Sequence, residues 1–149
     1  MMGFKDASWS HRYGQMGDEA EDRFERWAHK ASVKTERYGL HRPRINMSRL
    51  PAFLRHTPDF ILHDRLVEAK GVGQDGLVKL KEEQLGAWEF WYQHYPVWLF
   101  VWDSHRHREW FGEVTKPRIK WFRSCPEGVF EDNGKVYYEV NVEELWALE

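Results

Sequence analysis

The sequence predicts an α/β fold of mixed, α+β character, in which helices cover a mixed central sheet. Three features of the 149 residues support this prediction. Acidic residues at 18–19 precede apolar residues at helical spacing, which is typical of an amphipathic helix. Apolar runs of strand length follow, and Asn133-Gly134 lies between two of them as a hairpin signal. The elements do not alternate as regular strand–helix–strand units, so a purely parallel sheet is not expected.

One domain is expected to account for residues 1–149. This length is typical of a single domain, and 42% hydrophobic residues suffice for one core. We expect a loose start over residues 1–15, a main body over 17–102 and a C-terminal elaboration over 103–149. The longest unbroken apolar run is Val97–Trp102. A membrane-spanning helix needs about 20 such residues, so no membrane span is expected.

The N-terminal residues and the cysteine content predict an intracellular protein. No apolar stretch follows a basic one near the N-terminus, so a secretory signal is not expected. Cys125 is the single cysteine, which excludes an internal disulfide framework and a four-cysteine zinc site. We therefore expect a reducing, cytoplasmic environment.

Helices and strands can be assigned in order along the chain. The first helix is expected from Gly17 to about residues 32–34. An edge strand is expected somewhere within 44–54, a strand over 58–62, a tight turn at 63–65 and a central strand over 66–70. The glycines that follow lack the spacing of a dinucleotide-binding or phosphate-binding loop, so no nucleotide cofactor is expected; they are Gly71, Gly73 and Gly76.

A long second helix is expected over residues 77–94, because apolar side chains recur there at helical spacing and Pro96 follows. Asn141, with Glu144 three residues later, predicts a capping box that opens a short final helix. The remaining expected strands are 97–102, 109–114, 129–131 and 136–140.

The net charge of −2 hides two basic stretches. Residues 37–81 carry a net charge of +5 and residues 105–126 one of +4. If folding places both on one face, that face could neutralise several phosphates of a nucleic acid; the alternative is ordinary solvated surface. The candidate nucleic-acid-binding residues are Arg42, Arg44, Arg49, Arg55, Lys79, His105, Arg106 and Arg108.

Asp59, Glu68 and Lys70 form the pattern with the most specific chemistry. Glu68 and Lys70 are two residues apart on a strand, so their side chains point to the same face. The short turn at 63–65 makes the two strands antiparallel neighbours, which can bring Asp59 beside Glu68. Adjacent carboxylates repel unless a cation joins them, and oxygen ligands favour Mg²⁺ or Mn²⁺. Such a cation lowers the pKa of a bound water, so that hydroxide can form near neutral pH and attack a phosphodiester.

These residues resemble the signature of the PD-(D/E)XK nuclease superfamily, in which Pro-Asp is followed by Asp or Glu, any residue, and Lys. Here Pro58-Asp59 is followed, after eight residues, by Glu68-Ala69-Lys70. Gly17-x-x-x-Glu21-x-x-Phe24 is similar to a helix of the Holliday-junction resolvase-like and RecB-like branches. Gln84-x-x-x-Trp88 resembles the Gln-x-x-x-Tyr element of the RecB-like branch, with Trp in place of Tyr.

The resemblance covers about residues 17–102 and implies a restriction-endonuclease-like core of helix, three strands, helix and strand. Residues 103–149 have no counterpart in it. It also implies a cofactor, Mg²⁺, for which Mn²⁺ would substitute. Asp59 and Glu68 would be its main ligands, and the carbonyl oxygen of Ala69 a further one.

The resemblance also implies roles for three other residues. Glu21 would bind the metal directly or through water, although Glu19 or Glu25 could hold that position instead. Lys70 would orient the attacking water or stabilise charge on the phosphate. Gln84 would steady the site or the scissile strand; the alternative is a hydrogen-bonded glutamine in the core.

The expected function is that of a metal-dependent DNA endonuclease. By resemblance, it would be a homodimer selective for Holliday junctions or other branched DNA, as in recombination or repair. The alternatives are a DNA exonuclease, an RNA-processing nuclease of the same fold and a non-catalytic nucleic-acid-binding module. The run at 105–108 also allows a zinc site with Asp103 or Cys125, but its arginines oppose a cation, so a phosphate-contacting loop or plain surface is preferred.

Overall fold

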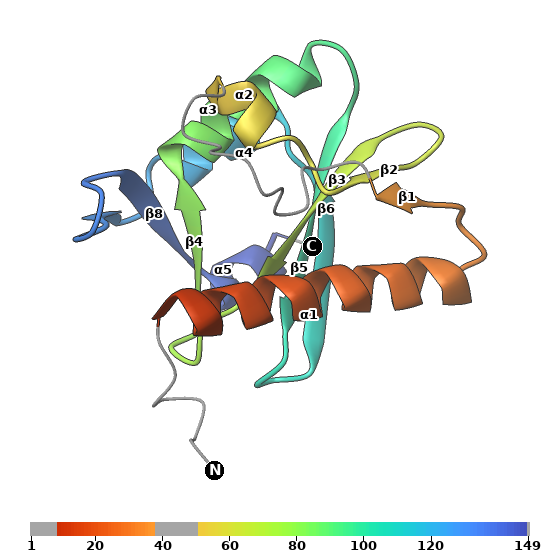
Figure 1. Ribbon diagram of the computed structural model, residues 1–149, viewed down its shortest axis with the longest axis horizontal. Helices are drawn as coiled ribbons and strands as arrows, with labels where there is room; N and C mark the ends of the chain where they lie inside the picture. Colours follow the sequence, from red (N-terminus) through yellow and green to blue (C-terminus); the bar gives the residue numbers. More distant parts are fainter. Residues whose placement is uncertain (1–8, 38–50, 149) are drawn as a thin grey trace.

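The computed structural model describes residues 9–37 and 51–148 (Figure 1). It contains short and long helices interspersed with strands, in an irregular order along the chain. The elements are α1 (Trp9–Lys30), β1 (Glu36–Arg37), α2 (Ala52–Arg55), β2 (Phe60–Ile61), β3 (Leu66–Gly71), β4 (Leu77–Lys81), α3 (Glu82–Tyr92), β5 (Val97–Asp103), β6 (Arg108–Glu113), α4 (Lys116–Phe122), β7 (Glu127–Val129), β8 (Val136–Asn141) and α5 (Val142–Trp146).

Five strands form a mixed, open sheet in the order β1-β2-β3-β5-β6. β3 and β5 are parallel, whereas the other neighbouring strands are antiparallel. A second, antiparallel sheet has the order β4-β8-β7. This arrangement confirms the predicted mixed α/β class, although the strand after β3 leaves the large sheet for the small one.

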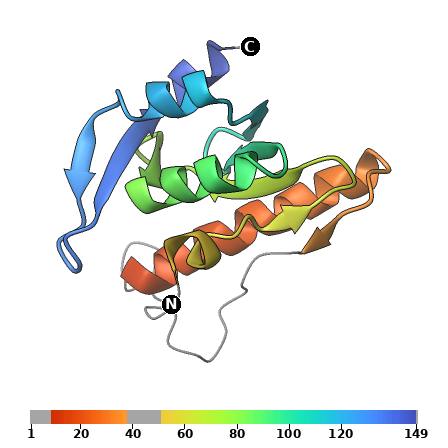
Figure 2. The same ribbon diagram turned by 90° about the horizontal axis from the view of Figure 1, so that it is seen from above.

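Helix α1 lies along one face of the five-stranded sheet, as two views at right angles show (Figures 1 and 2). Phe24 anchors it there, with its ring centroid 4.8 Å from that of Phe60 and 5.3 Å from that of Phe100. Burial of such large rings contributes much of the free energy that holds the helix on the sheet. Glu21, about one turn before Phe24, is thereby directed to the edge of β3.

The opposite face of the sheet packs against α3 and the small sheet. Trp88 of α3 is fully buried there. It shares this core with Leu80 of β4, Leu99 of β5 and Leu145 of α5. The small sheet is therefore fixed to the large one through a common apolar core.

Residues 77–81 form strand β4, so the prediction of a helix over 77–94 is wrong at its start. Leu77 and Leu80 fit a helical spacing, but residues 78–81 also alternate between apolar and basic side chains, which is a strand pattern. Pairing with β8, which lies far along the chain, favours the strand. Helix α3 consequently begins at Glu82.

Other boundaries differ from the predictions. Helix α1 begins at Trp9 rather than Gly17, so it continues through two glycines despite their low helix propensity. Strand β2 covers residues 60–61 alone. Of the edge strand expected within 44–54, residues 44–50 lie outside the described residues, and the helical turn α2 occupies most of the remainder.

The C-terminal third follows its local signals closely. Gly134 adopts a φ of +68° between β7 and β8, as the Asn133-Gly134 turn predicts. Asn141 caps α5 as expected, but it accepts a hydrogen bond from the Glu143 N–H at 2.9 Å rather than from the Glu144 N–H that the predicted capping box would use. Helix α4 was not expected, although Thr115 caps it and a proline stands in its first turn. Within the described ranges, none of the helices combines the length and apolar character needed to cross a membrane.

Candidate functional site

An open edge on β3 is the structural origin of the candidate site. β2 pairs with β3 only as far as Phe60 and Val67. In the part of the chain that the structure describes, no strand pairs with β3 beyond this point on the β2 side. Asp59, which precedes β2, takes the place of a strand there: its Oδ2 accepts a hydrogen bond from the Ala69 N–H at 2.8 Å. The same register sets Asp59 opposite Glu68, as the tight turn predicted.

Glu68 is only 6% exposed, and two side chains contact its Oε1 atom. Lys70 Nζ lies 3.4 Å away, and Gln84 Nε2 donates a hydrogen bond at 3.4 Å. Gln84 Oε1 accepts in turn from the Lys81 N–H at 3.3 Å. Gln84 therefore links the end of β4 to the buried carboxylate.

The acidic groups of the site resist ionisation. Burial raises the pKa of Asp59 to about 7, and the charge of Glu68 adds to this effect, while the Ala69 N–H and Lys70 partly oppose it. Burial also raises the pKa of Glu68, against the effect of the Lys70 charge. Buried carboxyl groups close to one another are the electrostatic situation that a bound cation relieves.

Glu21 is the acidic residue of α1 that reaches this site. It hydrogen-bonds with Asp59, and its charge contributes to the raised pKa of Glu68. Arg37 of β1 holds it from the other side, with Nη1 3.0 Å from Glu21 Oε2. The third acid is therefore already oriented toward the other two.

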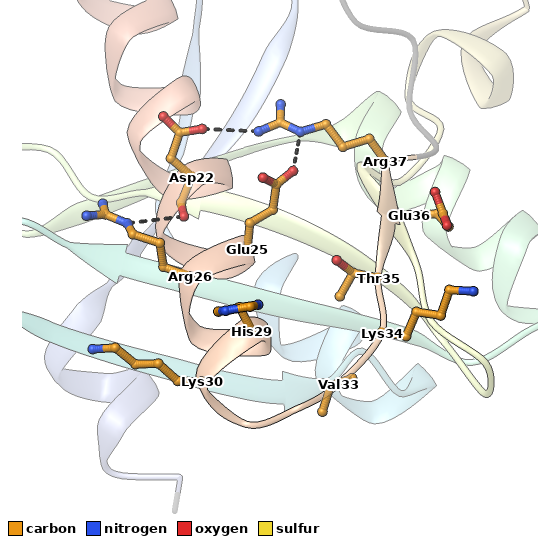
Figure 3. A pocket seen from close by; sticks show the side chains of 10 residues that line it. All are labelled: Asp22, Glu25, Arg26, His29, Lys30, Val33, Lys34, Thr35, Glu36 and Arg37. Carbon is orange, nitrogen blue, oxygen red and sulfur yellow. Dashed lines mark hydrogen bonds and ion pairs between the residues drawn. The ribbon is translucent and has the colours of Figure 1, made fainter.

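The other glutamates considered for this role point elsewhere. Glu25 binds the Nε atom of Arg37, and Asp22 binds its Nη2 atom at 3.1 Å (Figure 3). Glu19 is exposed. The Arg37 guanidinium thus contacts three carboxylates of α1 and fixes their orientations.

The oxygen atoms at this edge of β3 suit a hard divalent cation. The N–H of Ala69 points to Asp59, and because the N–H and C=O of a strand residue point to the same side, its carbonyl oxygen faces the same edge. Mg²⁺ commonly uses one or two carboxylates and keeps several waters. Among the described residues, no three His, Cys, Asp or Glu side chains form a metal site by themselves. A cation here would therefore depend on Asp59, Glu68, the Ala69 carbonyl and water.

His56 and Lys81 lie beside Lys70, and no sequence pattern indicated this. Burial lowers the pKa of His56 to about 4, and the charges of Lys70 and Lys81 act in the same direction. His56 Nε2 lies 3.2 Å from Glu83 Oε2. The imidazole is therefore neutral at neutral pH, and a basic region adjoins the acidic one.

Several predicted nucleic-acid-binding residues make contacts within the protein. Arg55 Nη2 lies 3.5 Å from Glu83 Oε2, and Arg106 Nη1 lies 3.0 Å from Asp103 Oδ2. Arg108 stacks on the Trp146 ring at 3.8 Å. His105 is exposed, and Lys79 contacts the ring of Tyr137. The remaining three lie outside the described residues: Arg42, Arg44 and Arg49.

Asp103 has a structural role that accounts for its burial. Its Oδ1 accepts hydrogen bonds from the N–H groups of His105 and Arg106, which shapes the turn between β5 and β6. Cys125 directs its Sγ atom to the Trp121 carbonyl at 3.6 Å. Neither contact supports a zinc site at residues 105–108.

No protein-family model, curated protein or solved structure matches the chain. Function is therefore inferred from the arrangement of its side chains.

Proposed function

We propose that the protein is a metal-dependent phosphodiesterase that cleaves DNA. One observation carries this proposal: the half-buried carboxylate of Asp59 and the buried carboxylate of Glu68 lie together at an open sheet edge, with the Lys70 ammonium 3.4 Å from Glu68. Buried acids with raised pKa values cost free energy, so their concentration at one accessible edge favours a functional role over a structural one.

The order of elements supports a restriction-endonuclease-like core. Apart from the short elements β1 and α2, which lie between α1 and β2, the chain follows the expected order of helix (α1), three strands (β2, β3 and β4), helix (α3) and strand (β5). Glu21, Asp59, Glu68 and Gln84 converge from four of these elements or from the residues that flank them. The position of β4 in a separate sheet is a departure from a continuous central sheet.

A role for each side chain follows from its contacts. A Mg²⁺ or Mn²⁺ ion held by Asp59 and Glu68 would supply Lewis-acid chemistry and lower the pKa of a nearby water. Lys70 would orient that water and donate hydrogen bonds to the phosphate oxygens as negative charge develops on them. Gln84 keeps Glu68 in position, and Glu21 completes the acidic cluster around Asp59.

The substrate is proposed to be DNA, with branched DNA and a homodimeric enzyme as the first expectation. RNA and DNA share the phosphodiester group, so an RNA-processing nuclease is the second candidate. An exonuclease would use the same catalytic residues. A non-catalytic binding module would have no chemical use for the Lys70–Glu68 pair, which is why catalysis is preferred.

A cleavage assay tests this proposal. The protein is incubated with plasmid, single-stranded DNA, a four-way junction and RNA, with Mg²⁺, Mn²⁺ or a chelator. We expect cleavage with either cation, loss of at least a hundredfold in rate for Glu68→Gln and Lys70→Ala, and no change for Asp64→Asn, whose carboxylate is exposed in the adjoining turn. Cleavage that survives chelation, or binding without cleavage under every condition, would contradict the proposal.

A further inference from the structure

We propose that Arg37 is a positioning residue that holds Glu21 away from the cation of the candidate site. The carboxylate of Glu21 then stays outside the set of oxygen ligands that Asp59 and Glu68 provide. The inference rests on the proposed function, because it concerns the same site, but its test measures cation binding rather than cleavage.

The edge of the sheet places Arg37 beside the candidate site. Arg37 of β1 pairs with Phe60 of β2, the residue that follows Asp59. The guanidinium carbon lies 5.6 Å from the centroid of the Phe60 ring. Figure 3 shows the side chain directed from β1 toward Asp22 and Glu25 of α1. Arg37 therefore reaches from the edge of the sheet to the acidic side of α1, next to Asp59.

The carboxylate of Glu21 is shared between Arg37 and Asp59. Its Oε2 atom lies 3.0 Å from Arg37 Nη1, and the side chain also hydrogen-bonds with Asp59. The contact with Arg37 is charge-assisted and hence stronger than a neutral hydrogen bond. A cation has to displace Arg37 to bind this oxygen, and the guanidinium also offsets the negative charge that attracts the cation to Glu21.

Two other carboxylates keep the Arg37 guanidinium in place. Glu25 accepts a hydrogen bond from its Nε atom, and Asp22 accepts one from its Nη2 atom at 3.1 Å. Because the planar guanidinium is already fixed by these two contacts, little further entropy is lost when Nη1 binds Glu21. The loss of one anchor should therefore leave the contact with Glu21 intact.

Withholding a third carboxylate leaves room for water around the cation. Mg²⁺ commonly binds one or two protein carboxylates and keeps several waters. Direct binding of Glu21 would replace one of these waters, although the proposed hydrolysis needs a cation-bound water as its nucleophile. Arg37 thus lowers the affinity for the cation and preserves a position for the attacking water.

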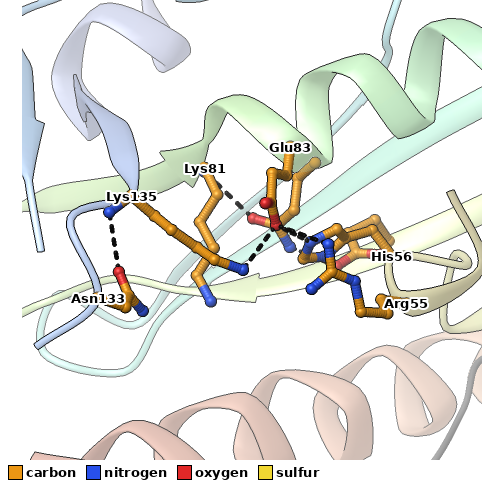
Figure 4. Close-up of polar contacts among 8 residues, drawn as sticks. Arg55, His56, Lys81, Glu83, Asn133 and Lys135 are labelled. Carbon is orange, nitrogen blue, oxygen red and sulfur yellow. Dashed lines mark hydrogen bonds and ion pairs between the residues drawn. The ribbon is translucent and has the colours of Figure 1, made fainter. Parts of the chain in front are cut away.

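A second ion-pair network near the site has the opposite arrangement, because one carboxylate there holds several basic groups. Glu83 Oε2 lies 3.0 Å from Lys135 Nζ and 3.2 Å from His56 Nε2 (Figure 4). Arg55 Nη2 lies 3.5 Å from the same atom. This network includes none of the proposed cation ligands. Removal of one of its cations therefore changes the charge near the site without releasing a carboxylate that the cation could use.

Isothermal titration with Mn²⁺ at pH 8 tests the inference on the full chain. The proteins compared are the wild type, Arg37→Gln, Glu21→Gln and the double variant. We expect Arg37→Gln to bind Mn²⁺ about tenfold more tightly, because Glu21 can then join the ligands. Glu21→Gln should change the Kd of the wild type by less than about threefold, since Arg37 already withholds this carboxylate. The double variant should lose the tenfold gain.

Three control variants separate the release of Glu21 from a loss of charge and from a loosening of α1. Arg26→Gln removes an arginine charge from the same helix, and Lys135→Gln removes a cation from the network in Figure 4. Glu25→Gln removes one anchor of Arg37. Each should keep the Kd for Mn²⁺ within about twofold of the wild type. Circular dichroism verifies that every variant is folded.

The outcomes distinguish this inference from the proposed function. Three results would overturn the inference even if Glu68→Gln abolishes cleavage: no gain in Mn²⁺ affinity for Arg37→Gln, a gain that persists in the double variant, or an equal gain for Arg26→Gln or Lys135→Gln. Conversely, a gain that depends on Glu21 would uphold the inference even if no nucleic acid is cleaved, and the proposed function would then be wrong. Absence of Mn²⁺ binding in all of these proteins would contradict both.

Discussion

The main-chain N–H of Ala69 donates a hydrogen bond to Asp59 Oδ2 at 2.8 Å, so a carboxylate occupies the place of a neighbouring strand. This contact fixes Asp59 at the edge of β3 through the main chain of residue 69 alone. It also explains why the acid lies beside Glu68, since both are set by the same strand register. The functional proposal depends on this local interruption of the sheet.

The free energy of unfolding of the wild type is expected to fall as pH rises, and Asp59→Asn should remove the part of this fall that Asp59 causes. The pKa of Asp59 is raised to about 7 in the folded protein. A carboxyl group with a raised pKa contributes stability below its usual pKa near 4, and this contribution is lost as pH rises through about 7. The free energy of unfolding, measured by urea in EDTA, should fall on the order of 3 kcal/mol between pH 4 and pH 8 from this group alone.

The asparagine variant should show a shallower pH dependence than the wild type. Asp64→Asn is the matched control, because Arg65 lowers the pKa of that exposed carboxylate and its replacement leaves the buried acids intact. Parallel curves for the wild type and Asp59→Asn would show that Asp59 ionises normally.

Gln84→Ala should impair both stability and catalysis. The substitution leaves Glu68 Oε1 and the Lys81 N–H without this partner, which costs about 1–3 kcal/mol when the groups are buried. Urea denaturation and the initial rate of DNA cleavage measure the two effects. Gln93→Ala, an exposed residue at the end of the same helix, is the control and should change neither. A cleavage rate equal to that of the wild type would limit Gln84 to a structural role.

Phe24→Ala is expected to destabilise the protein by about 3–5 kcal/mol. The phenyl ring is fully buried and contacts rings on α1, β2 and β5, so its removal leaves a cavity under the helix. Val129→Ala, at a position 54% exposed, should change the free energy of unfolding by less than about 0.5 kcal/mol. A loss below about 1 kcal/mol for Phe24→Ala would mean that α1 is only loosely attached.

Local signals predicted the elements whose contacts are close in sequence. The turn at 63–65 fixed the pairing of β2 with β3, and hence the neighbourhood of Asp59 and Glu68. Asn141 and Gly134 likewise marked a helix start and a hairpin. Such features depend on a few adjoining residues, whose conformational preferences the sequence displays directly.

Contacts between segments that are distant in the sequence could not be predicted from such local signals. Residues 77–81 carry both helical and strand periodicity, and the strand prevails because β8 pairs with it. Which glutamate of α1 joins the site depends on Arg37 and on the rotation of the helix over the sheet. His56 reaches Lys70 only through the packing of α2 against α3, which no local pattern records.

Isothermal titration of the protein with Mn²⁺ at pH 8 tests the central claim most directly. We predict binding at a site that Asp59→Asn and Glu68→Gln each weaken at least tenfold, as expected when a carboxylate ligand is removed, while Asp64→Asn binds as the wild type does. Equal Mn²⁺ affinity in all four proteins, or no binding to the wild type, would contradict the assignment of Asp59 and Glu68 as the ligands of a catalytic cation.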